Sequence, residues 1–262
     1  MSLIYDTLRK NSPNCALIPF ITAGFPNIKT TIDALYALDS NGADVIELGI
    51  PYSDALADGP IIQKSSKISL DQGIHLDDII KMLKSVTPSL NAPIIIFTYY
   101  NPVLAKGIAD FICDISSAGA SGLIIPDLPL EESDYIMKLC DACNIELILF
   151  IAPTSSSNRI KRIISKSRGC IYLVSSCGVT GLRDEISSRV NILAKDIKTQ
   201  ANKVIMLGFG ISNEEQAKDL SKWSIDGIVI GSAFMKLMLN SSSSKSIESV
   251  GNFCNLIKRT IK

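Results

Sequence analysis

Eight short apolar segments, each followed by a stretch with helical periodicity, constrain the fold of this chain more than any other feature. They are rich in isoleucine, valine and leucine with little polar alternation, as is typical of parallel strands buried on both faces. Apolar residues three and four positions apart predict helices between them, for example over 30–42 and 76–86. The predicted strands span 16–22, 44–49, 93–99, 122–127, 145–152, 170–175, 203–209 and 226–231.

Eight strand–helix units in 262 residues predict an α/β fold, a closed (β/α)8 barrel that forms a single domain over residues 1–262. An open, doubly wound sheet is the alternative. No break in composition divides the chain, and the serine-rich run at 240–245 is interpreted as a surface connection before a last helix at 246–260. Functional residues of such barrels lie at the carboxyl ends of the strands and in the loops that follow.

Charge, hydropathy and cysteine content argue against several classes of function. The 26 Lys and Arg residues balance 26 Asp and Glu residues, which argues against general binding to nucleic acid or an anionic membrane. We expect no signal segment and no membrane span, because no apolar run approaches ~18 residues. Seven scattered cysteines suit a reducing compartment, and the C-x-x-C of Cys140 and Cys143 is interpreted as structural.

Carboxylates follow the second predicted strand. Side chains alternate along a strand, so Ile46 and Leu48 suit the helix-packed face and Glu47 is predicted to point into the barrel. Burial raises the pKa of a carboxyl group, which suits it to proton transfer near neutral pH. Asp58, in the following loop, is either a second functional carboxylate or a helix N-cap, and Asp54 is either functional or an ordinary turn residue.

A metal site is not predicted. The one histidine, His75, lies at a predicted helix start, and no cluster of His, Cys and Asp has ligand spacing. No strand end carries a lysine placed for a Schiff base, because Lys106 follows the third strand at a distance of several residues. Carboxylates are therefore the expected agents of proton transfer.

Small residues end the late strands, in the runs 178–181, 208–212 and 231–232. Glycine lets backbone N–H groups approach an anion closely, and the loops after strands 7 and 8 of such barrels commonly hold a phosphate. We expect a phosphate site there, although each glycine alone would also suit a tight turn. Part of an apolar set at the strand ends is expected to line the substrate pocket: Phe20, Tyr99, Leu123, Ile125, Phe150 and Tyr172.

Six segments of the chain resemble the alpha subunits of tryptophan synthase, and the resemblance extends through nearly the whole chain. The segment at 43–63, ADVIELGIPYSDALADGPIIQ, is highly specific. The others are PFITAGFP, YNPVLAKGI, GLIIPDLPLEES, YLVSSCGVTG and GFGIS, at 19–26, 100–108, 122–133, 172–181 and 208–212. The resemblance implies a (β/α)8 barrel with an extra N-terminal helix. It also implies a lyase that cleaves indole-3-glycerol phosphate to indole and glyceraldehyde 3-phosphate.

Site residues are assigned by the same resemblance. Glu47 matches the catalytic glutamate, Asp58 the catalytic aspartate and Tyr172 the tyrosine near the reacting centre. Phe20 and Tyr99 match ring-contacting positions, and Thr180 lies in the loop that closes over the site. The phosphate-binding positions are matched by Gly181, Phe209, Gly210, Gly231 and Ser232. The chain departs from the family pattern at Ala55, where a proline is common, and at Ser176, where an arginine is frequent; both positions are in loops.

The resemblance also implies a partner, the tryptophan synthase beta subunit, in an α2β2 heterotetramer that channels indole. No cofactor is expected in this chain; pyridoxal phosphate is expected only in the beta subunit. The location implied is the cytoplasm, or the plastid stroma of an alga whose plastid encodes the protein. Three alternatives remain: a stand-alone lyase that releases free indole, a weakly catalytic activating subunit, and another sugar-phosphate barrel enzyme such as an isomerase.

Overall fold

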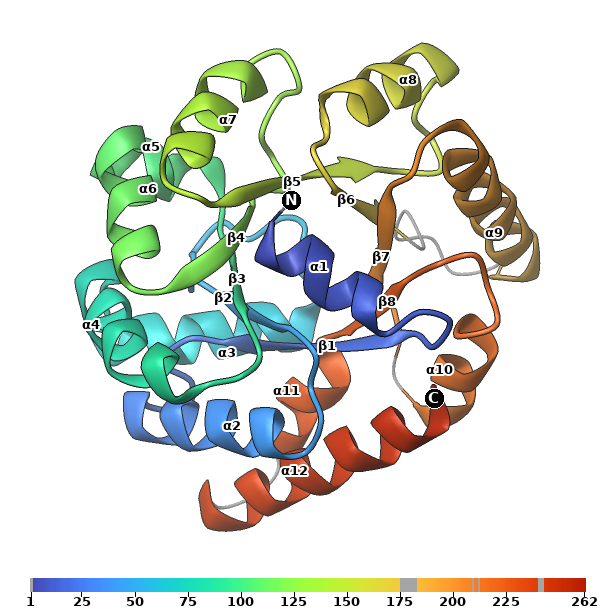
Figure 1. Cartoon of the computed structure of the whole chain (residues 1–262). Coiled ribbons are helices and arrows are strands. Elements are labelled where there is room, and N and C mark those ends of the chain that lie inside the picture. Colours follow the sequence, from blue (N-terminus) through green and yellow to red (C-terminus); the bar gives the residue numbers. More distant parts are fainter. Residues whose placement is uncertain (1, 175–182, 209, 212, 240–242) are drawn as a thin grey trace.

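Eight parallel strands close into a barrel in sequence order, with β1 beside β8 (Figure 1). The computed structural model describes all residues except 1, 175–182, 209, 212 and 240–242, and leaves out the side chains of 183–188, 243 and 244. The barrel prediction is confirmed and the open sheet is excluded, because β1 pairs with both β2 and β8. The strands are β1 (Ala16–Thr22), β2 (Ile46–Gly49), β3 (Ile94–Phe97), β4 (Ala120–Ile124), β5 (Glu146–Ile151), β6 (Cys170–Val174), β7 (Val204–Gly208) and β8 (Gly227–Ile230).

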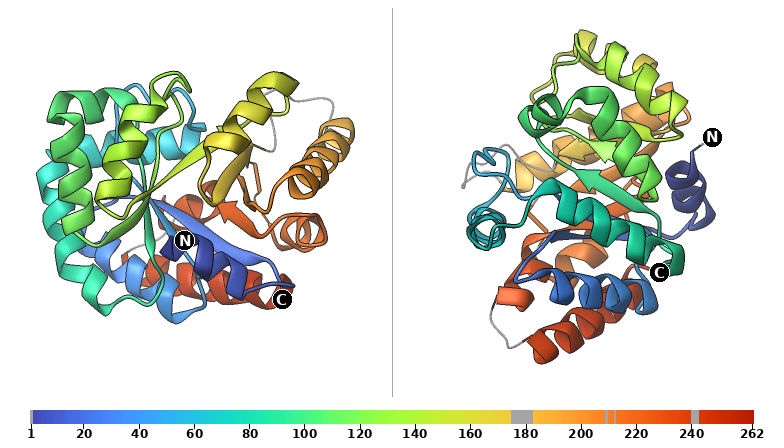
Figure 2. Two further views of the ribbon diagram at one scale, coloured as in Figure 1. Left: turned by 45° about the horizontal axis from the view of Figure 1, so that its top comes forward. Right: turned by 90° about the vertical axis from the view of Figure 1, so that its left-hand side faces the viewer.

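Helices form a layer around the barrel (Figure 2). Their apolar faces cover strands that are buried throughout, which explains why the strand segments read as continuous apolar runs. The helices are α2 (Ile28–Ser40), α3 (Pro60–Asp71), α4 (Leu76–Val86), α5 (Tyr100–Lys106), α6 (Ile108–Ser117), α7 (Ser133–Ala142), α8 (Ser157–Lys166), α9 (Arg183–Gln200), α10 (Glu214–Leu220), α11 (Ser232–Leu239) and α12 (Ser243–Thr260), with a short 3-10 turn, η1 (Thr87–Ser89).

The extra N-terminal helix, α1 (Leu3–Lys10), lies across the end of the barrel where the strands begin (Figure 1). Ser2 caps its first turn by accepting a hydrogen bond from the backbone N–H of Tyr5 at 3.1 Å. Ile4, Tyr5 and Leu8 are buried against the strand ends. Because α1 closes this end, the opposite end, where the strands finish, is left for a substrate.

Strand register places Glu47 in the interior. Phe20, Glu47, Ile95 and Gly122 are successive register partners from β1 to β4. Paired residues of adjacent strands share a face of the sheet, so these four face the same way. Glu47 lines a cavity inside the barrel mouth, which confirms the alternation predicted for β2.

Most strand boundaries differ by one to three residues from the sequence prediction; the largest shift is in β4, which spans Ala120–Ile124 rather than 122–127. Two further differences have a local explanation. The second strand begins at Ile46 rather than residue 44, because the carboxylate of Asp44 accepts the N–H of Leu17 and pairs with Lys258. The serine-rich run is not a connection over its whole length, because α12 already begins at Ser243. Within the described part of the chain, no helix is long and apolar enough to cross a membrane.

Candidate active site

A cavity of about 210 Å³ opens at the carboxyl ends of the strands. It brings together residues from β1, β2, β3, β6 and β8, from the loop after β2, from α3 and from the start of α11. Its lining combines two carboxylates with apolar and aromatic side chains, as expected for a site that binds an organic substrate. The lining residues are Phe20, Glu47, Asp58, Gly59, Ile62, Phe97, Tyr172, Gly210, Ile211, Val229, Gly231 and Ser232.

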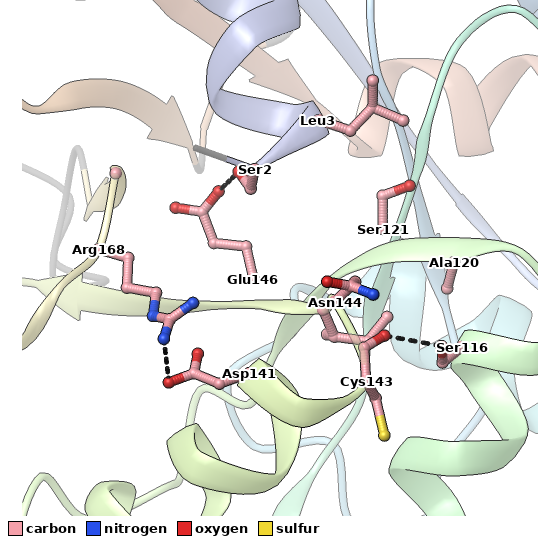
Figure 3. Close-up of a pocket in the computed structure, with 12 residues that line it drawn as sticks. Ser2, Leu3, Ser116, Ala120, Ser121, Asp141, Cys143, Asn144, Glu146 and Arg168 are labelled. Carbon is pink, nitrogen blue, oxygen red and sulfur yellow. Dashed lines mark hydrogen bonds and ion pairs between the residues drawn. The ribbon is translucent and has the colours of Figure 1, made fainter.

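A second cavity, of about 510 Å³, lies at the opposite end of the barrel, beside α1 (Figure 3). Glu146, its buried carboxylate, is fully engaged: it accepts hydrogen bonds from Ser2 Oγ and from the N–H of Cys170. Arg168 pairs with Asp141 in the same region. This cavity is larger, but its charged groups satisfy one another, and conserved chemistry in this barrel architecture belongs to the other end.

Glu47 is the most perturbed carboxyl group of the smaller cavity. It is 1% exposed, and no described residue donates a hydrogen bond to its Oε2. Burial, and then the negative charge of Asp58, raise its pKa to about 8. A carboxyl group with this pKa holds a proton at neutral pH and can donate it, then take one back.

Asp58 lies in the loop between β2 and α3, and is half-buried at the cavity. It is not the helix N-cap: Gly59 occupies that position, without a side-chain cap, and Pro60 begins α3. Burial raises the pKa of Asp58 to about 6, against the opposing effect of a hydrogen bond from Tyr99. Asp58 is therefore ionised at a pH where Glu47 still carries its proton.

Tyr99 ties the loop of Asp58 to the barrel. Its hydroxyl accepts a hydrogen bond from the N–H of Ala57 at 3.1 Å and donates one to Asp58. The loop is closed further by Ala55, whose carbonyl accepts from the N–H of Asp58 and from Gln63 Nε2, each at 3.1 Å. Tyr99 does not line the cavity itself; it holds a residue that does.

Tyr172, on β6, is buried and lines the cavity next to the carboxylates. Burial raises its pKa well above the ordinary value, and the charges of Glu47 and Asp58 add to the effect, so the phenol stays neutral. Its ring lies against Phe150, with ring centroids 4.7 Å apart. The position of the hydroxyl depends on Gly208 of β7, where a Cβ atom would overlap it.

Small residues at the carboxyl ends of the last two strands line one side of the cavity. Gly210 has a φ of +82°, a conformation that favours glycine. Gly231 and Ser232 stand at the beginning of α11, where the N–H of Met235 bonds to the carbonyl of Gly231 at 3.0 Å. The first N–H groups of a helix are unpaired within it, and they favour an anion.

The structure brings together Glu47, Asp58, Tyr172, Phe20, Gly210, Gly231 and Ser232, as the sequence predicted. Thr180, Gly181, Phe209 and Ser176 lie outside the described residues. Leu123, Ile125 and Phe150 do not line the cavity. Sequence reasoning missed Phe97, Ile62, Ile211 and Val229; Phe97 was detectable, because it is two positions from Ile95, the register partner of Glu47.

Other polar residues singled out in the sequence have structural surroundings. His75 is the N-cap of α4, where it forms a capping box with Asp78. Lys106 pairs with Asp77 and Asp114 at the surface. The carboxylate of Asp54 accepts a hydrogen bond from Ser53 at an exposed turn. Among the described residues no three His, Cys, Asp or Glu side chains are grouped as metal ligands.

The open end of this barrel holds two carboxyl groups with raised pKa values, and Gly231 and Ser232, at the start of α11, line the same cavity; this combination suits acid–base chemistry on an anionic substrate. These features define a βα-barrel of the enzyme class, with carboxyl groups at the end where the strands finish. The sequence model of the family described as "Tryptophan synthase alpha chain" matches residues 7–261. The chain belongs to the tryptophan synthase alpha chain family, which confirms the resemblance seen in the sequence.

Relatives and solved structures agree with this assignment. The tryptophan synthase alpha chain of Gracilaria tenuistipitata var. liui is 59% identical over 261 residues, covering 100% of this chain and 97% of the relative. That of Trichodesmium erythraeum is 47% identical, covering 98% and 97%. The crystal structure of the alpha subunit from Legionella pneumophila has a TM-score of 0.89 at 30% identity, covering 100% and 98%. A tryptophan synthase complex from Pyrococcus furiosus has a TM-score of 0.84 at 30% identity, covering 93% and 98%.

Proposed function

We propose that this chain, as one domain of residues 1–262, catalyses the alpha reaction of tryptophan synthase. The reaction is the retro-aldol cleavage of indole-3-glycerol phosphate to indole and glyceraldehyde 3-phosphate, in tryptophan biosynthesis. The observation that supports it most strongly is Glu47, a buried carboxyl group at the barrel mouth whose pKa is raised to about 8 and whose Oε2 has no partner among the described residues. The family assignment supplies the substrate.

Glu47 performs both proton transfers in this proposal. The bond between the indole ring and the glycerol chain cannot break while the ring is aromatic. Neutral Glu47 donates its proton to indole C3, and the ring becomes an electron sink. The resulting carboxylate removes the proton of the adjacent glycerol hydroxyl, the carbon–carbon bond breaks, and its electron pair restores the aromatic ring. Glu47 ends protonated, so it is ready for another cycle.

Asp58 stabilises the charge that develops on the ring. Protonation at C3 makes the indole nitrogen positive, and an ionised carboxylate that accepts its N–H hydrogen bond lowers the energy of that state. The lower pKa of Asp58, about 6, keeps it ionised while Glu47 is protonated. Phe20 and Tyr172 supply apolar surface for the ring, and Tyr99 positions the loop that carries Asp58.

The phosphate is assigned to the amides at the beginning of α11 and the neighbouring loops. Gly210, Gly231 and Ser232 line that side of the cavity, and the helix dipole favours a negative charge there. Thr180, Gly181 and Phe209 are added by the family resemblance. This side of the cavity is formed by the ends of β7 and β8. The phosphate group of the substrate would therefore bind there, while the indole ring lies near the carboxyl groups.

The partner is proposed to be the tryptophan synthase beta subunit, in an α2β2 heterotetramer that channels indole. Solved relatives include a tryptophan synthase complex. The proposed contact lies at the loop after β2 (50–59), at 100–106 and at 126–134. It includes two exposed apolar side chains, Leu56 at 91% and Leu104 at 50% exposure. No cofactor is assigned to this chain, and pyridoxal phosphate is assigned to the beta subunit.

The cellular location is proposed to be a plastid stroma or a bacterial cytoplasm, because the relatives include red algal and cyanobacterial proteins. The balanced net charge gives no support to binding of nucleic acid or of an anionic membrane.

Indole release from indole-3-glycerol phosphate tests the function, with the purified chain alone and with an added beta subunit. We expect slow release alone and faster release with the beta subunit. Brisk turnover that the beta subunit does not change would favour the stand-alone lyase. Two results together would favour a purely activating subunit. The chain alone would release no indole, and the Asp58→Asn variant would activate the beta subunit as well as the unaltered chain does.

A further inference from the structure

We propose that Cys113 and Cys143 are a redox modification site, at which a reversible disulfide links α6 to the end of α7. The two sulfur atoms lie 3.7 Å apart. The two cysteines are 30 residues apart in the sequence, so no local motif predicts that they are close. The C-x-x-C motif in the sequence is a different pair, Cys140 and Cys143.

The geometry needs little change to form the bond. Sulfur atoms of a disulfide are about 2.05 Å apart, so the two thiols must approach by less than the width of one atom. Cys143 is the C-cap of α7, with its backbone N–H bonded to the carbonyls of Leu139 and Cys140. Ser116, one turn beyond Cys113 on α6, donates a hydrogen bond from its Oγ to the carbonyl of Cys143 at 2.8 Å (Figure 3). This bond already fixes the two helices beside each other.

Access distinguishes this pair from the other described cysteines. Cys113 is exposed and Cys143 is half-buried, whereas Cys15, Cys140, Cys170 and Cys254 are all buried. Cys140 has a relative exposure of 0%, and burial raises its pKa to about 12, so it forms little thiolate. A soluble disulfide therefore meets Cys113 before any of these buried thiols.

The roles of the two thiols follow from their surroundings. Burial, and then the hydrogen bond shared with Cys113, raise the pKa of Cys143. Cys113 is the more exposed of the two, so it is the thiol that attacks an external disulfide, and Cys143 resolves the mixed disulfide.

The exchange is balanced with an external disulfide as oxidant. The thiolate of Cys113 attacks one sulfur of the oxidant, which leaves as a thiolate and takes up a proton. The thiolate of Cys143 then attacks the Cys113 sulfur and releases the second thiol. The protein loses two hydrogen atoms, the oxidant is reduced to two thiols, and an external dithiol reverses both steps.

The crosslink lies away from the substrate cavity. Cys143 precedes β5, at the end of the barrel where strands begin, whereas Glu47 and Asp58 belong to the end where they finish. Residues 114–142, enclosed by the crosslink, include β4 and the whole of α7. The disulfide therefore links α6 to the end of α7, the helices on either side of β4 in the sequence, and does not contact the residues assigned to catalysis.

Peptide mapping of the whole folded chain tests the proposal. The chain is incubated with oxidised glutathione, free thiols are blocked under denaturing conditions, and the protein is cleaved before aspartate and after arginine. Cys113, Cys140 and Cys143 then fall in separate peptides, 110–113, 134–140 and 141–159. We expect 110–113 joined to 141–159 by a bond that dithiothreitol breaks.

Cys113→Ser is the matched control, since it changes one atom at an exposed position and should not disturb folding. In this variant we expect 141–159 with a blocked or glutathionylated Cys143 and no internal link. The proposal is wrong if the unaltered chain carries blocked or glutathionylated Cys113 and Cys143 after oxidation, or if 134–140 is the peptide joined to 141–159.

Discussion

Gly208 leaves the space that the hydroxyl group of Tyr172 occupies. A Cβ atom at position 208, on β7, would overlap the phenol oxygen and the adjacent ring carbons of Tyr172, on β6. The ring of Tyr172 is buried and packs against Phe150, so it has little freedom to retreat. The glycine is thus a condition for the position of a residue that lines the substrate cavity.

Gly208→Ala is therefore expected to displace Tyr172 and lower kcat/KM for indole-3-glycerol phosphate by about tenfold or more, equivalent to ~1.4 kcal/mol. The strain also destabilises the fold by ~1–3 kcal/mol, as is usual for overpacking. Steady-state kinetics and urea unfolding measure the two effects. The matched background is Tyr172→Ala, which removes the overlapped oxygen and ring carbons; there the alanine at position 208 should cost less. Equal costs in both backgrounds would contradict the steric explanation.

The pH dependence of kcat/KM should be bell-shaped. Asp58 must be ionised and Glu47 protonated, so activity rises as pH passes about 6 and falls as it passes about 8. Because the two carboxyl groups interact, the limbs report apparent pKa values of the pair. A profile that is flat from pH 5 to pH 9 would refute this assignment of protonation states.

The titration of Glu47 should also make the free energy of unfolding depend on pH. The folded chain keeps a proton on Glu47 up to a pKa of about 8, whereas the unfolded chain loses it near the ordinary pKa of 4.5. The unfolded state binds fewer protons between these values, so this group lowers the free energy of unfolding as pH rises, with a slope of up to about 1.4 kcal/mol per pH unit. Below 4.5 and above 8 the effect is constant.

Glu47→Gln removes this titration, so the unfolding free energy of the unaltered chain minus that of the variant should decline across the same window. Denaturant titrations at a series of pH values measure the difference. The other ionisable groups are common to both chains and cancel, apart from Asp58, whose own titration is coupled to that of Glu47. A difference that does not change with pH would show that Glu47 titrates alike in the folded and unfolded states.

Tyr99→Phe should move the acidic limb of the rate profile. The hydroxyl donates a hydrogen bond that lowers the pKa of Asp58, so without it this pKa rises above about 6. The N–H of Ala57 also loses its partner, and the loop becomes less well positioned. We expect kcat/KM to fall by about tenfold. Tyr135→Phe, at a side chain 58% exposed on α7, is the matched control and should change neither limb nor rate. If the acidic limb of the rate profile does not move in Tyr99→Phe, the proposed effect of Tyr99 on the pKa of Asp58 is wrong.

The sequence predicted the features that depend on local periodicity. Unbroken apolar runs identified all eight strands, and strict alternation in β2 oriented Glu47. Asp58 was left between an N-cap and a functional carboxylate, because both roles suit an aspartate before Gly-Pro. The observed N-cap, Gly59, excludes the first reading.

Relationships between distant segments escaped prediction. Tyr99 was expected against the substrate ring, yet its hydroxyl bonds to the loop after β2, because the side chain reaches across from the start of α5. Cys113 and Cys143 approach each other only once α6 and α7 pack side by side. Gly208 appeared as part of a glycine-rich ending, whereas its neighbour Tyr172 is what requires it. The spacing of residues along the sequence does not predict any of these three contacts.

The proton transfers assigned to Glu47 are tested most directly by a single turnover of indole-3-glycerol phosphate in Glu47→Gln, with substrate binding measured separately. Glutamine keeps the shape of the side chain but neither donates nor accepts the required proton. The expected result is a cleavage step slower by at least ~10²-fold, the lower end for a lost general acid–base, with a nearly unchanged Kd for the substrate. Cleavage at a rate near that of the unaltered chain would contradict the assignment.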